Sequence, residues 1–250
     1  MSHDRPEATL LFAATSDLHM GDGSPRDDFG RAQSERLCRS VEALAPIFVR
    51  CPGARVVLVG DVCDAWRYDL GKILAAHEHE LSLVASMSSR PVLWMRGNHD
   101  SVLRRLDLPE HLDRRVVLLR DVVLGGWYIA HGDQWDPDPG VWRRVGVGAC
   151  KALSWVGRTF GAGAENRLDR WASRLEGHGR HGKADRYSLA AVKAARAEFD
   201  RVGQVPVGVV FGHTHRAGEG CIDGVEWVDL GTMPVDGWAL VWSDGVVTRV

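Results

Sequence analysis

The sequence predicts an α/β fold in which two mixed β-sheets pack face to face and helices cover their outer faces. Up to residue 95, short apolar runs alternate with amphipathic helical stretches, which is the order of a parallel sheet with helical crossovers. From residue 116 onward, strand-like runs follow one another without long helices between most of them. Near the C-terminus, Asp223-Gly224 and Asp244-Gly245 each separate two apolar runs, and this pattern predicts antiparallel hairpins.

The N-terminal half is predicted to contain buried strands linked by amphipathic helices. In chain order we expect a strand over residues 9–15, a helix over 31–49, a strand over 56–59, a helix over 70–88 and a strand over 91–95. The run 56–59 is apolar throughout, which is typical of a strand buried on both faces. His77 and His79 fall within the second helix, and we expect them to be surface or packing residues and not metal ligands.

The C-terminal half is predicted to be mainly β-structure. Its strand-like runs cover residues 116–119, 122–124, 127–130 and 205–211. Gly125-Gly126 stands between two of these runs and is expected to form a hairpin turn. One domain over residues 1–250, interrupted by an insertion over 137–203, accounts for the whole chain.

The insertion over 137–203 is helix-forming and basic. Helices are expected over 142–160, 165–175 and 184–202, and basic residues outnumber acidic ones in this range. One interpretation is a basic lid over an anionic substrate, and the other is a solvated helical decoration. Its large aromatic residues either pack on the core or line an apolar groove for a lipid chain. They are Trp142, Trp155, Phe160 and Trp171.

Composition narrows the class of protein. The formal net charge is −2, so the overall charge indicates no particular partner. The five cysteines are scattered and lack C-x-x-C spacing, which argues against a disulfide framework and against a thiolate zinc site. The N-terminus is polar, and its first apolar run is too short for a signal peptide or a membrane span. We therefore expect a soluble cytoplasmic protein, with peripheral contact at the inner face of a membrane left open.

Residue types that bind metals occur at the ends of the predicted strands. They are Asp17, His19, Asp61, Asn98, His99, His131, His213 and His215. Because open α/β sheets gather their chemistry at the carboxyl ends of the strands, we expect these side chains to converge around Asp61. Oxygen and imidazole ligands without a thiolate suit Mn²⁺, Fe or Zn²⁺, and a carboxylate that can bridge indicates two ions. Such a site polarises a phosphoryl oxygen.

These motifs resemble those of the calcineurin-like metallophosphoesterases, and they occur in that family's order between residues 15 and 216. The resemblance is carried by Asp17-Leu18-His19, Gly60-Asp61-Val62-Cys63-Asp64, Gly97-Asn98-His99-Asp100, His131 and Gly212-His213-Thr214-His215. It implies a four-layer α/β/β/α sandwich with a helical insertion, and two divalent ions, with Mn²⁺ favoured and Fe or Zn²⁺ as alternatives.

The resemblance also implies a role for each site residue. One metal would be held by Asp17, His19 and His215, the other by Asn98, His131 and His213, with Asp61 bridging the two. His99 would protonate the leaving oxygen or stabilise phosphoryl charge, and Asp64 would orient its imidazole. Asp100 is expected to be a local structural cap.

A finer resemblance is to the UDP-2,3-diacylglucosamine pyrophosphohydrolases. It is carried by Asp64-Ala65-Trp66, His131-Gly132-Asp133-Gln134-Trp135-Asp136, the helical insertion with Tyr187, and Gly212-His213-Thr214-His215-Arg216. This resemblance implies a nucleotide-linked lipid whose acyl chains bind beneath a helical lid, with substrate contacts from Asp133, Tyr187 and Arg216. The best-studied members carry Arg where this chain has His99, and Glu where it has Asp64.

Because the His99 and Asp64 pair suits ordinary ester hydrolysis as well, three hypotheses stay open. The first is hydrolysis of a pyrophosphate or phosphodiester, such as that of a nucleotide-linked lipid, and the second is a broad phosphodiesterase for nucleotides, cyclic ones included. The third is a non-catalytic scaffold of the same fold, although metal ligands are typically lost in such proteins and this chain keeps them. A nucleic-acid substrate also stays open, because a basic lid suits a polyphosphate backbone, but the absence of a wider basic surface disfavours it.

Overall fold

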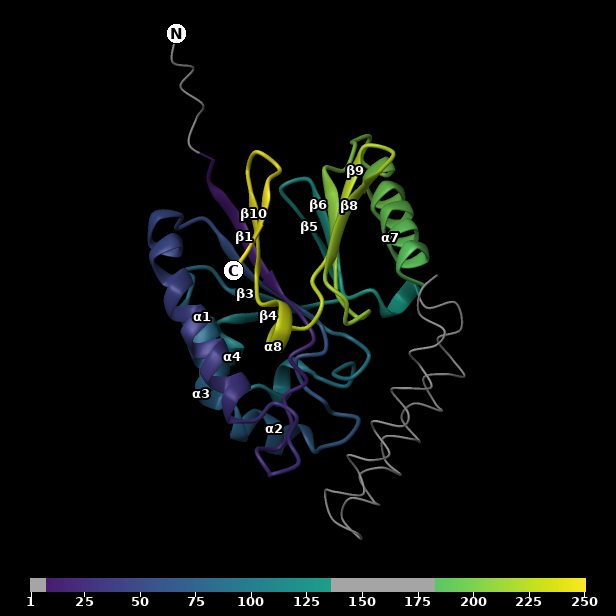
Figure 1. Cartoon of the computed structure of the whole chain (residues 1–250). Helices are drawn as coiled ribbons and strands as arrows, with labels where there is room; N and C mark the ends of the chain where they lie inside the picture. Colours follow the sequence, from purple (N-terminus) through teal and green to yellow (C-terminus); the bar gives the residue numbers. More distant parts are fainter. Residues whose placement is uncertain (1–7, 136–182) are drawn as a thin grey trace.

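A computed structural model describes residues 8–135 and 183–250 as two mixed β-sheets packed face to face (Figure 1). The first sheet has the order β11-β10-β1-β2-β3-β4, and the second has the order β5-β6-β7-β9-β8. The first sheet consists of β1 (Leu10–Thr15), β2 (Arg55–Val59), β3 (Val92–Met95), β4 (Val116–Leu119), β10 (Ala239–Trp242) and β11 (Val247–Arg249). The second consists of β5 (Asp121–Leu124), β6 (Trp127–Ala130), β7 (Gly208–Phe211), β8 (Gly218–Ile222) and β9 (Val225–Asp229).

Helices cover the outer face of each sheet and complete four layers. They are α1 (Arg31–Arg50), α2 (Leu70–Ala76), α3 (Glu78–Ser86), α4 (Glu110–Asp113), α7 (Lys183–Asp200) and α8 (Met233–Asp236), with the short 3-10 helices η1 (Arg105–Asp107) and η2 (Asp133–Trp135). In Figure 1, α1 and α3 lie outside the first sheet and α7 lies outside the second. The predicted α/β sandwich with two mixed sheets is thus confirmed.

Strand alternation explains why β2 is apolar from Val56 to Val59. Val56 and Leu58 pack in the cluster beneath the helices, whereas Val57 and Val59 pack in the cluster between the two sheets. Successive side chains of a strand point to opposite faces, so a strand covered on both faces has no polar position. The layer between the sheets is completed from the second sheet by large side chains such as Trp127.

The predicted hairpins are present in the second half of the chain. Gly125 and Gly126 join β5 to β6 with φ of 58° and 85°, and the flanking residues Leu124 and Trp127 are paired. Positive φ at both central residues gives the turn a twist that matches the strands, and glycine adopts it at little cost. Asp223-Gly224 and Asp244-Gly245 likewise link β8 to β9 and β10 to β11.

The predicted helix over 70–88 is divided in the structure at His77. His77 ends α2 and precedes α3, with φ −114° and ψ 23°. Its side chain is buried, and its Nε2 lies 2.9 Å from Asp27 Oδ2. The ring of Phe29 also contacts the His77 ring edge-on. His77 is therefore a packing residue, as predicted, and its contact with a distant loop accompanies the break in the helix.

Part of the predicted insertion belongs to the layers of the fold. Helix α7 buries Ala191, Val192, Ala195 and Phe199 against the second sheet. The strand predicted over 205–211 begins only at Gly208 in the structure. Val205, within the predicted range, is exposed. Insertion residues 137–182 lie outside the described residues, and with them the helices expected over 142–160 and 165–175 and their aromatic residues.

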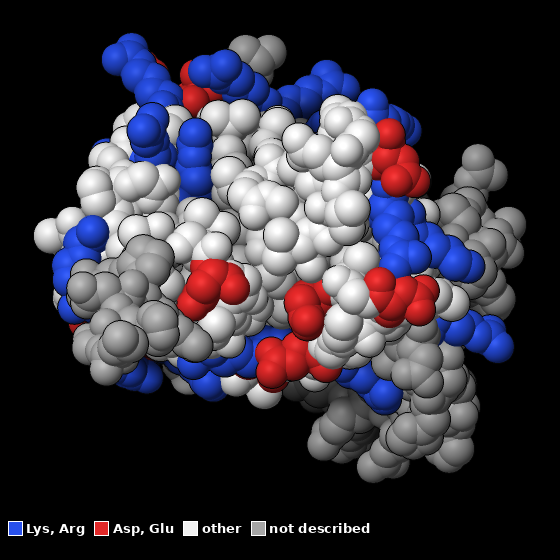
Figure 2. All heavy atoms as spheres, turned by 90° about the horizontal axis from the view of Figure 1, so that it is seen from above, with Lys and Arg blue, Asp and Glu red and all other residues white. Residues whose placement is uncertain are grey.

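The composition also bears on the cysteines, the helices and the surface charge. Cys38, Cys51, Cys63 and Cys221 carry free thiols, and Cys150 lies outside the described residues. Within the described ranges, no helix has the length and apolar character needed to cross a membrane. Figure 2 looks onto the end of the molecule that is uppermost in Figure 1, where basic side chains lie mainly around the rim with acidic ones among them. This end does not present an extended surface of one charge.

The buried pair of Asp27 and His77 yields a stability prediction. Burial raises the pKa of Asp27, but hydrogen bonds from His77 and from the backbone N–H groups of Gly23, Phe29 and Gly21 outweigh burial and lower it. Asp27→Ala leaves these donors without an acceptor, so we expect a loss of about 3–5 kcal/mol in the free energy of unfolding. Urea denaturation at neutral pH measures it.

The same pair predicts a pH dependence and has a matched control. Since the folded pKa of Asp27 lies below the unfolded value of about 3.9, its stabilisation is present above that value. It is lost as the pH falls through the folded pKa. Glu35→Ala removes an exposed acidic partner of Arg31 on α1 and should change stability by only about 0.5 kcal/mol. Equal effects of the two substitutions would contradict the prediction.

Candidate metal centre

The candidate ligands leave the strand ends in an unusual backbone conformation. Asp17, His19, Asp61, His213 and His215 have φ of 52°, 50°, 50°, 71° and 57°. In the described part of the chain, Asp223 in a hairpin turn is the other non-glycine residue with positive φ. A positive φ is uncommon for residues with a Cβ and costs about 1–3 kcal/mol at each site. Such strain persists where the surrounding structure enforces it, and it gathers at functional sites.

The loops after β1 and β2 stay paired beyond the strands. Backbone N–H groups of Asp17 and His19 donate to the carbonyl oxygens of Gly60 (3.1 Å) and Asp61 (3.0 Å). Further along, Met20 N–H donates to Val62 O at 2.8 Å. The residues with positive φ change the direction of each loop, but the hydrogen bonds between the two loops continue. As a result, the ligands of the first loop lie directly beside Asp61.

Asp17, His19 and His215 form the first group of converging ligand atoms. Asp17 Oδ1 lies 3.0 Å from His215 Nε2 and 3.6 Å from His19 Nε2, and the two Nε2 atoms are 3.1 Å apart. Asp17 Oδ1 is buried and accepts no hydrogen bond, although Oδ2 accepts one from the backbone N–H of His213. A buried carboxylate oxygen that faces two imidazole nitrogens fits a cation.

Asp61, His131 and His213 form the second group. His131 Nε2 lies 3.2 Å from Asp61 Oδ2 and 3.2 Å from Asn98 Oδ1. His131 Nδ1 lies 2.8 Å from the carbonyl oxygen of Val59. Since a carbonyl can only accept, Nδ1 carries the proton, and in the neutral ring the lone pair of Nε2 faces the site. Metal-binding histidines commonly have this arrangement.

Asp61 connects the groups. Among residues 8–135 and 183–250, three sets have ligand atoms that all lie within 4.8 Å of one another, and Asp61 belongs to two of them. These sets are Asp17 with His19 and His215, His19 with Asp61 and His99, and Asp61 with His131 and His213. Carboxylate and imidazole donors around a shared carboxylate suit two divalent ions of the Mn²⁺, Fe or Zn²⁺ type.

The charged groups of the site shift the pKa values of one another. Burial raises the pKa of Asp17, yet the imidazoles of His19 and His215 beside its Oδ1 hold it well below its ordinary value. Burial likewise raises the pKa of Asp61, while the charge of His131 lowers it further than burial raises it. Burial lowers the pKa of His19, but Asp17 and Asp61 raise it to about 9. Both carboxylates are thus ionised and surrounded by groups able to carry positive charge.

Glycines allow the close approach of these side chains. A Cβ at Gly97 would lie 2.2 Å from Asp61 Oδ1, and one at Gly60 would lie 2.4 Å from the His131 ring. Gly212 is equally constrained, because its Cβ would lie 2.6 Å from Asp17 Oδ2. At each of these three positions, a residue with a Cβ would therefore clash with a ligand side chain.

His99 lies beside the ligands and is held by Asp64. Its Nδ1 donates to Asp64 Oδ1 at 2.8 Å, which leaves Nε2 available. Its backbone N–H donates to Asp61 Oδ1 at 2.7 Å. His99 also belongs to one ligand set, so its geometry is compatible with general acid chemistry and with direct ligation.

Asp100 does more than the local cap that was expected. It is fully buried and accepts hydrogen bonds from Gly97 N, Val62 N and Trp94 Nε1. Burial and the charge of Asp61 raise its pKa to about 6. The bond to Gly97 is the local cap, and the bond to Val62 ties the loop after β3 to the loop after β2.

Sequence reasoning missed Asp229 and Trp66. Asp229 ends β9 and accepts hydrogen bonds from the hydroxyl of Thr214 and from Gly231 N. Burial raises the pKa of Asp229 to about 7. Thr214 lies between His213 and His215, so Asp229 supports that loop. Its position at a strand end was the available signal. Trp66 contacts His99, although the sequence offers no pattern that pairs them.

The predicted substrate residues lie around the edge of the centre. Tyr187 on α7 places its ring 5.9 Å from the ring of His213. Asp133 begins η2, and Arg216 is exposed directly after His215. Asp136, the last residue of the motif that contains Asp133, lies outside the described residues.

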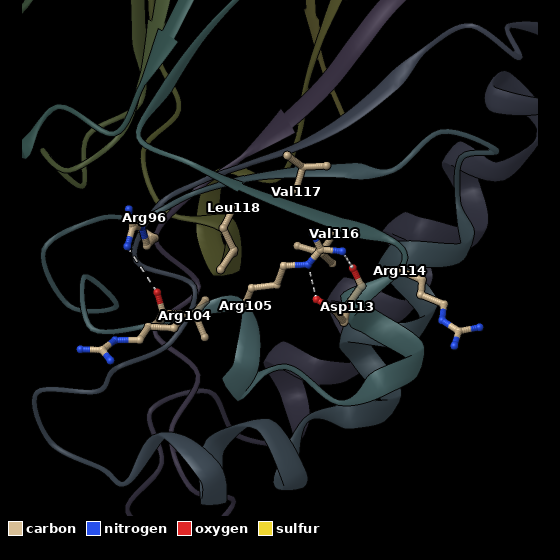
Figure 3. Close-up of a pocket in the computed structure, with 9 residues that line it drawn as sticks. Arg96, Arg104, Arg105, Asp113, Arg114, Val116, Val117 and Leu118 are labelled. Carbon is tan, nitrogen blue, oxygen red and sulfur yellow. Dashed lines mark hydrogen bonds and ion pairs between the residues drawn. The ribbon is translucent and has the colours of Figure 1, made fainter.

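A separate cavity of about 400 Å³ lies against β4, η1 and α4 (Figure 3). It is lined by Arg96, Leu103, Arg104, Arg105, Asp113, Arg114, Val116, Val117 and Leu118. Arg105 points toward Asp113 and forms an ion pair with it, and Arg114 pairs with Glu110. None of the ligand residues lines it, so this cavity is distinct from the metal centre.

Comparison with known proteins gives one family match. A model described as calcineurin-like phosphoesterase matches residues 10–217. None of the curated proteins matches the chain.

Similar solved structures are distant. An archaeal phosphodiesterase has 12% identity and a TM-score of 0.44, with 96% of this chain and 98% of that chain covered. Vacuolar protein sorting 29 from Cryptosporidium parvum has 14% identity and a TM-score of 0.41, with 97% and 96% covered. Phosphopantetheinyl hydrolase from Mycobacterium tuberculosis has 17% identity and a TM-score of 0.39, with 89% of each chain covered. These likenesses are too low to bear on function.

Metal content should distinguish ligands from His99. Asp61→Ala removes the carboxylate shared by two ligand sets, so we expect it to lose bound metal after reconstitution with Mn²⁺ and desalting. His99→Ala should keep its metal, because a general acid can be removed without dismantling the ligands. Elemental analysis measures both. Asp223→Ala is the matched control, because it replaces a positive-φ aspartate in a hairpin turn. Loss of metal from His99→Ala would identify His99 as a ligand.

Proposed function

Because the chain belongs to the calcineurin-like phosphoesterase family, we propose that it is a dinuclear metal-dependent hydrolase of a phosphodiester or pyrophosphate bond. The observation that carries the proposal is the presence of three overlapping ligand sets, two of which include Asp61 and one of which includes His99. A fold alone does not determine activity. Here the ligand atoms and a candidate acid occur together in one site.

The two ions would be held by the residues that the sequence indicated. Asp17, His19 and His215 would bind one, Asn98, His131 and His213 would bind the other, and Asp61 would bridge them. The buried Asp17 Oδ1 and the hydrogen bond from His131 to Val59 support this assignment. When bound, the ions supply Lewis-acid polarisation of the phosphoryl group and activation of the attacking water, and Mn²⁺ is the ion we favour.

His99 would protonate the leaving group, and Asp64 would orient His99. Hydrolysis forms a bond from water oxygen to phosphorus and breaks the bond from phosphorus to the leaving oxygen, which then needs a proton. His99 would give it this proton from Nε2, because Nδ1–H is engaged by Asp64. The carboxylate holds the imidazole in one orientation. Asp64 is buried, whereas His99 is partly exposed to solvent.

A nucleotide-linked lipid such as UDP-2,3-diacylglucosamine is the finer substrate proposal. The support is the sequence resemblance, together with the placement of Tyr187 and Arg216 beside His213 and His215. An aromatic ring and a guanidinium group next to the metals suit a base or an acyl chain and a diphosphate. Peripheral contact with a membrane surface would follow from such a substrate.

A broad nucleotide phosphodiesterase is the second candidate. The observation that favours it is the His99–Asp64 hydrogen bond of 2.8 Å, because a histidine acid serves an ester leaving group that needs a proton. Cyclic and linear nucleotide diesters would then be substrates. Comparison of turnover on these diesters with turnover on the nucleotide-linked lipid separates the candidates.

Metal removal tests the general proposal. Exhaustive chelation should abolish hydrolysis of bis(p-nitrophenyl) phosphate, and added Mn²⁺ should restore it, because the ions activate the water. The readout is release of p-nitrophenolate by the full chain before and after chelation. Full activity in protein shown by elemental analysis to be free of metal would refute the proposal.

Substitution of His99 tests the assignment of the acid. His99→Ala should lower kcat by about 10²–10⁴-fold on a diester with a poor leaving group, such as diphenyl phosphate. Steady-state kinetics with metal content determined in parallel measures this loss. Unchanged kcat would mean that another group protonates the leaving oxygen.

The finer substrate proposal predicts a selective effect at Tyr187 and Arg216. Tyr187→Ala and Arg216→Ala should raise KM for UDP-2,3-diacylglucosamine, because each contact would hold the bulky part of that substrate. Neither should change KM for bis(p-nitrophenyl) phosphate, which lacks those groups. Arg201→Ala is the control, because Arg201 directly follows the C-terminal end of α7 and pairs with Glu198. Equal effects on both substrates would contradict the proposed contacts.

A further inference from the structure

The indole ring of Trp66 lies flat against the imidazole of His99. The ring centroids are 4.0 Å apart and the planes differ by 18°. Asp64 accepts the Nδ1 hydrogen of the same imidazole, and the ring of His19 meets it edge-on at 4.7 Å. The His99 ring is thereby held along one edge and over one face. Rotation of the ring away from the site would break both the hydrogen bond and the stacking contact.

Trp66 also holds the peptide unit between Asn98 and His99. Its Nε1 donates to the carbonyl oxygen of Asn98 at 2.8 Å. The N–H of the same peptide unit donates to Asp61 Oδ1 at 2.7 Å. Both polar groups of this peptide are therefore engaged, one by the indole and the other by the carboxylate proposed to bridge the metals. This peptide joins the proposed ligand Asn98 to the proposed acid.

The segment that carries Trp66 is itself anchored. The carbonyl oxygen of Asp64 accepts from the backbone N–H of Arg67 at 3.2 Å and of Tyr68 at 3.1 Å, which closes a turn around Ala65 and Trp66. The backbone N–H of Asp64 donates to Met20 O at 2.9 Å, and the Tyr68 hydroxyl donates to Arg26 O at 2.6 Å. Asp64 and Trp66 therefore contact His99 from one short turn that is fixed at both ends.

From these contacts we propose that Trp66 is a positioning residue for the acid step. It would hold the His99 imidazole in the orientation from which Nε2 reaches the leaving oxygen. This inference rests on the proposed function, in which His99 supplies that proton. Trp66 acts through His99 and does not itself exchange a proton.

A positioning role for the acid predicts a dependence on the leaving group. p-Nitrophenolate departs without a proton, whereas phenolate needs one, so only the second reaction depends strongly on His99. Bis(p-nitrophenyl) phosphate and diphenyl phosphate differ in this respect and are otherwise similar in shape. A residue that merely stabilises the fold or the metals would affect the two substrates equally.

The experiment measures kcat for both diesters with the full-length protein loaded with Mn²⁺, and metal content in each variant. Trp66→Leu removes the stacking ring and the N–H donor, so its kcat on diphenyl phosphate should fall by about 10²-fold, the effect of a misplaced catalytic group. Its kcat on bis(p-nitrophenyl) phosphate should fall only a few-fold. Trp66→Phe keeps a stacked ring without the donor, and its loss should lie between wild type and Trp66→Leu.

Two controls complete the test. Trp242→Leu removes another indole whose Nε1 makes a hydrogen bond, here to Thr248 on the edge strand β11, and it should leave the ratio of the two kcat values unchanged. In a His99→Ala background, Trp66→Leu should cause no further loss on diphenyl phosphate, because residues that act as one unit are not additive.

The outcomes separate this inference from the proposed function. Equal losses on both diesters with metal retained, or additive losses in the His99→Ala background, would overturn the role of Trp66 while metal-dependent hydrolysis stands. Loss of metal in proportion to activity in both Trp66 variants would also overturn it, since Trp66 would then support the ligands. Absence of any metal-dependent hydrolysis by the wild-type protein would refute the proposed function itself.

Discussion

Two buried carboxylates at neighbouring strand ends are the constraint on which the rest of the site depends. Asp17 and Asp61 are both almost inaccessible to solvent, and β1 pairs directly with β2. Like charges in such surroundings repel strongly and lose their hydration, so they require positive partners. Imidazole groups supply these partners, and a divalent cation would satisfy the same oxygens. This requirement accounts for His19 and His215 beside Asp17 and for His131 and His213 beside Asp61.

The need to bring side chains from several loops to these carboxylates explains the local strain. Five site residues adopt positive φ, and Gly60 and Gly97 leave no room for a Cβ beside His131 and Asp61. The strands offset this cost, because those that deliver the ligands are buried on both faces. Val57 and Val59, for example, pack between the sheets next to the loop that bears Asp61. The packed core of the sheets thus keeps the ligand loops in their strained backbone conformation.

The candidate metal centre also contains ligand residues from both sheets. Asp17 and Asp61 follow strands of the first sheet, whereas His131 and His213 follow strands of the second. The apolar layer between the sheets is one connection, and the ligand groups at their common end are another. A change in the packing of one sheet on the other would therefore alter distances between ligands. This coupling gives a physical reason for large side chains such as Trp127 in that layer.

The sequence by itself determined the fold class, most strands, the hairpin turns and the set of candidate ligands. These features depend on local patterns, because apolar runs and Asp-Gly or Gly-Gly pairs act over a few residues, and the family resemblance assigned the roles. Only the tertiary structure decided the break at His77, the support of Thr214 by Asp229, the packing of α7 on the second sheet and the contact of Trp66 with His99. Each of these joins residues far apart in the chain. Their partners are chosen by packing and burial, which no local pattern encodes.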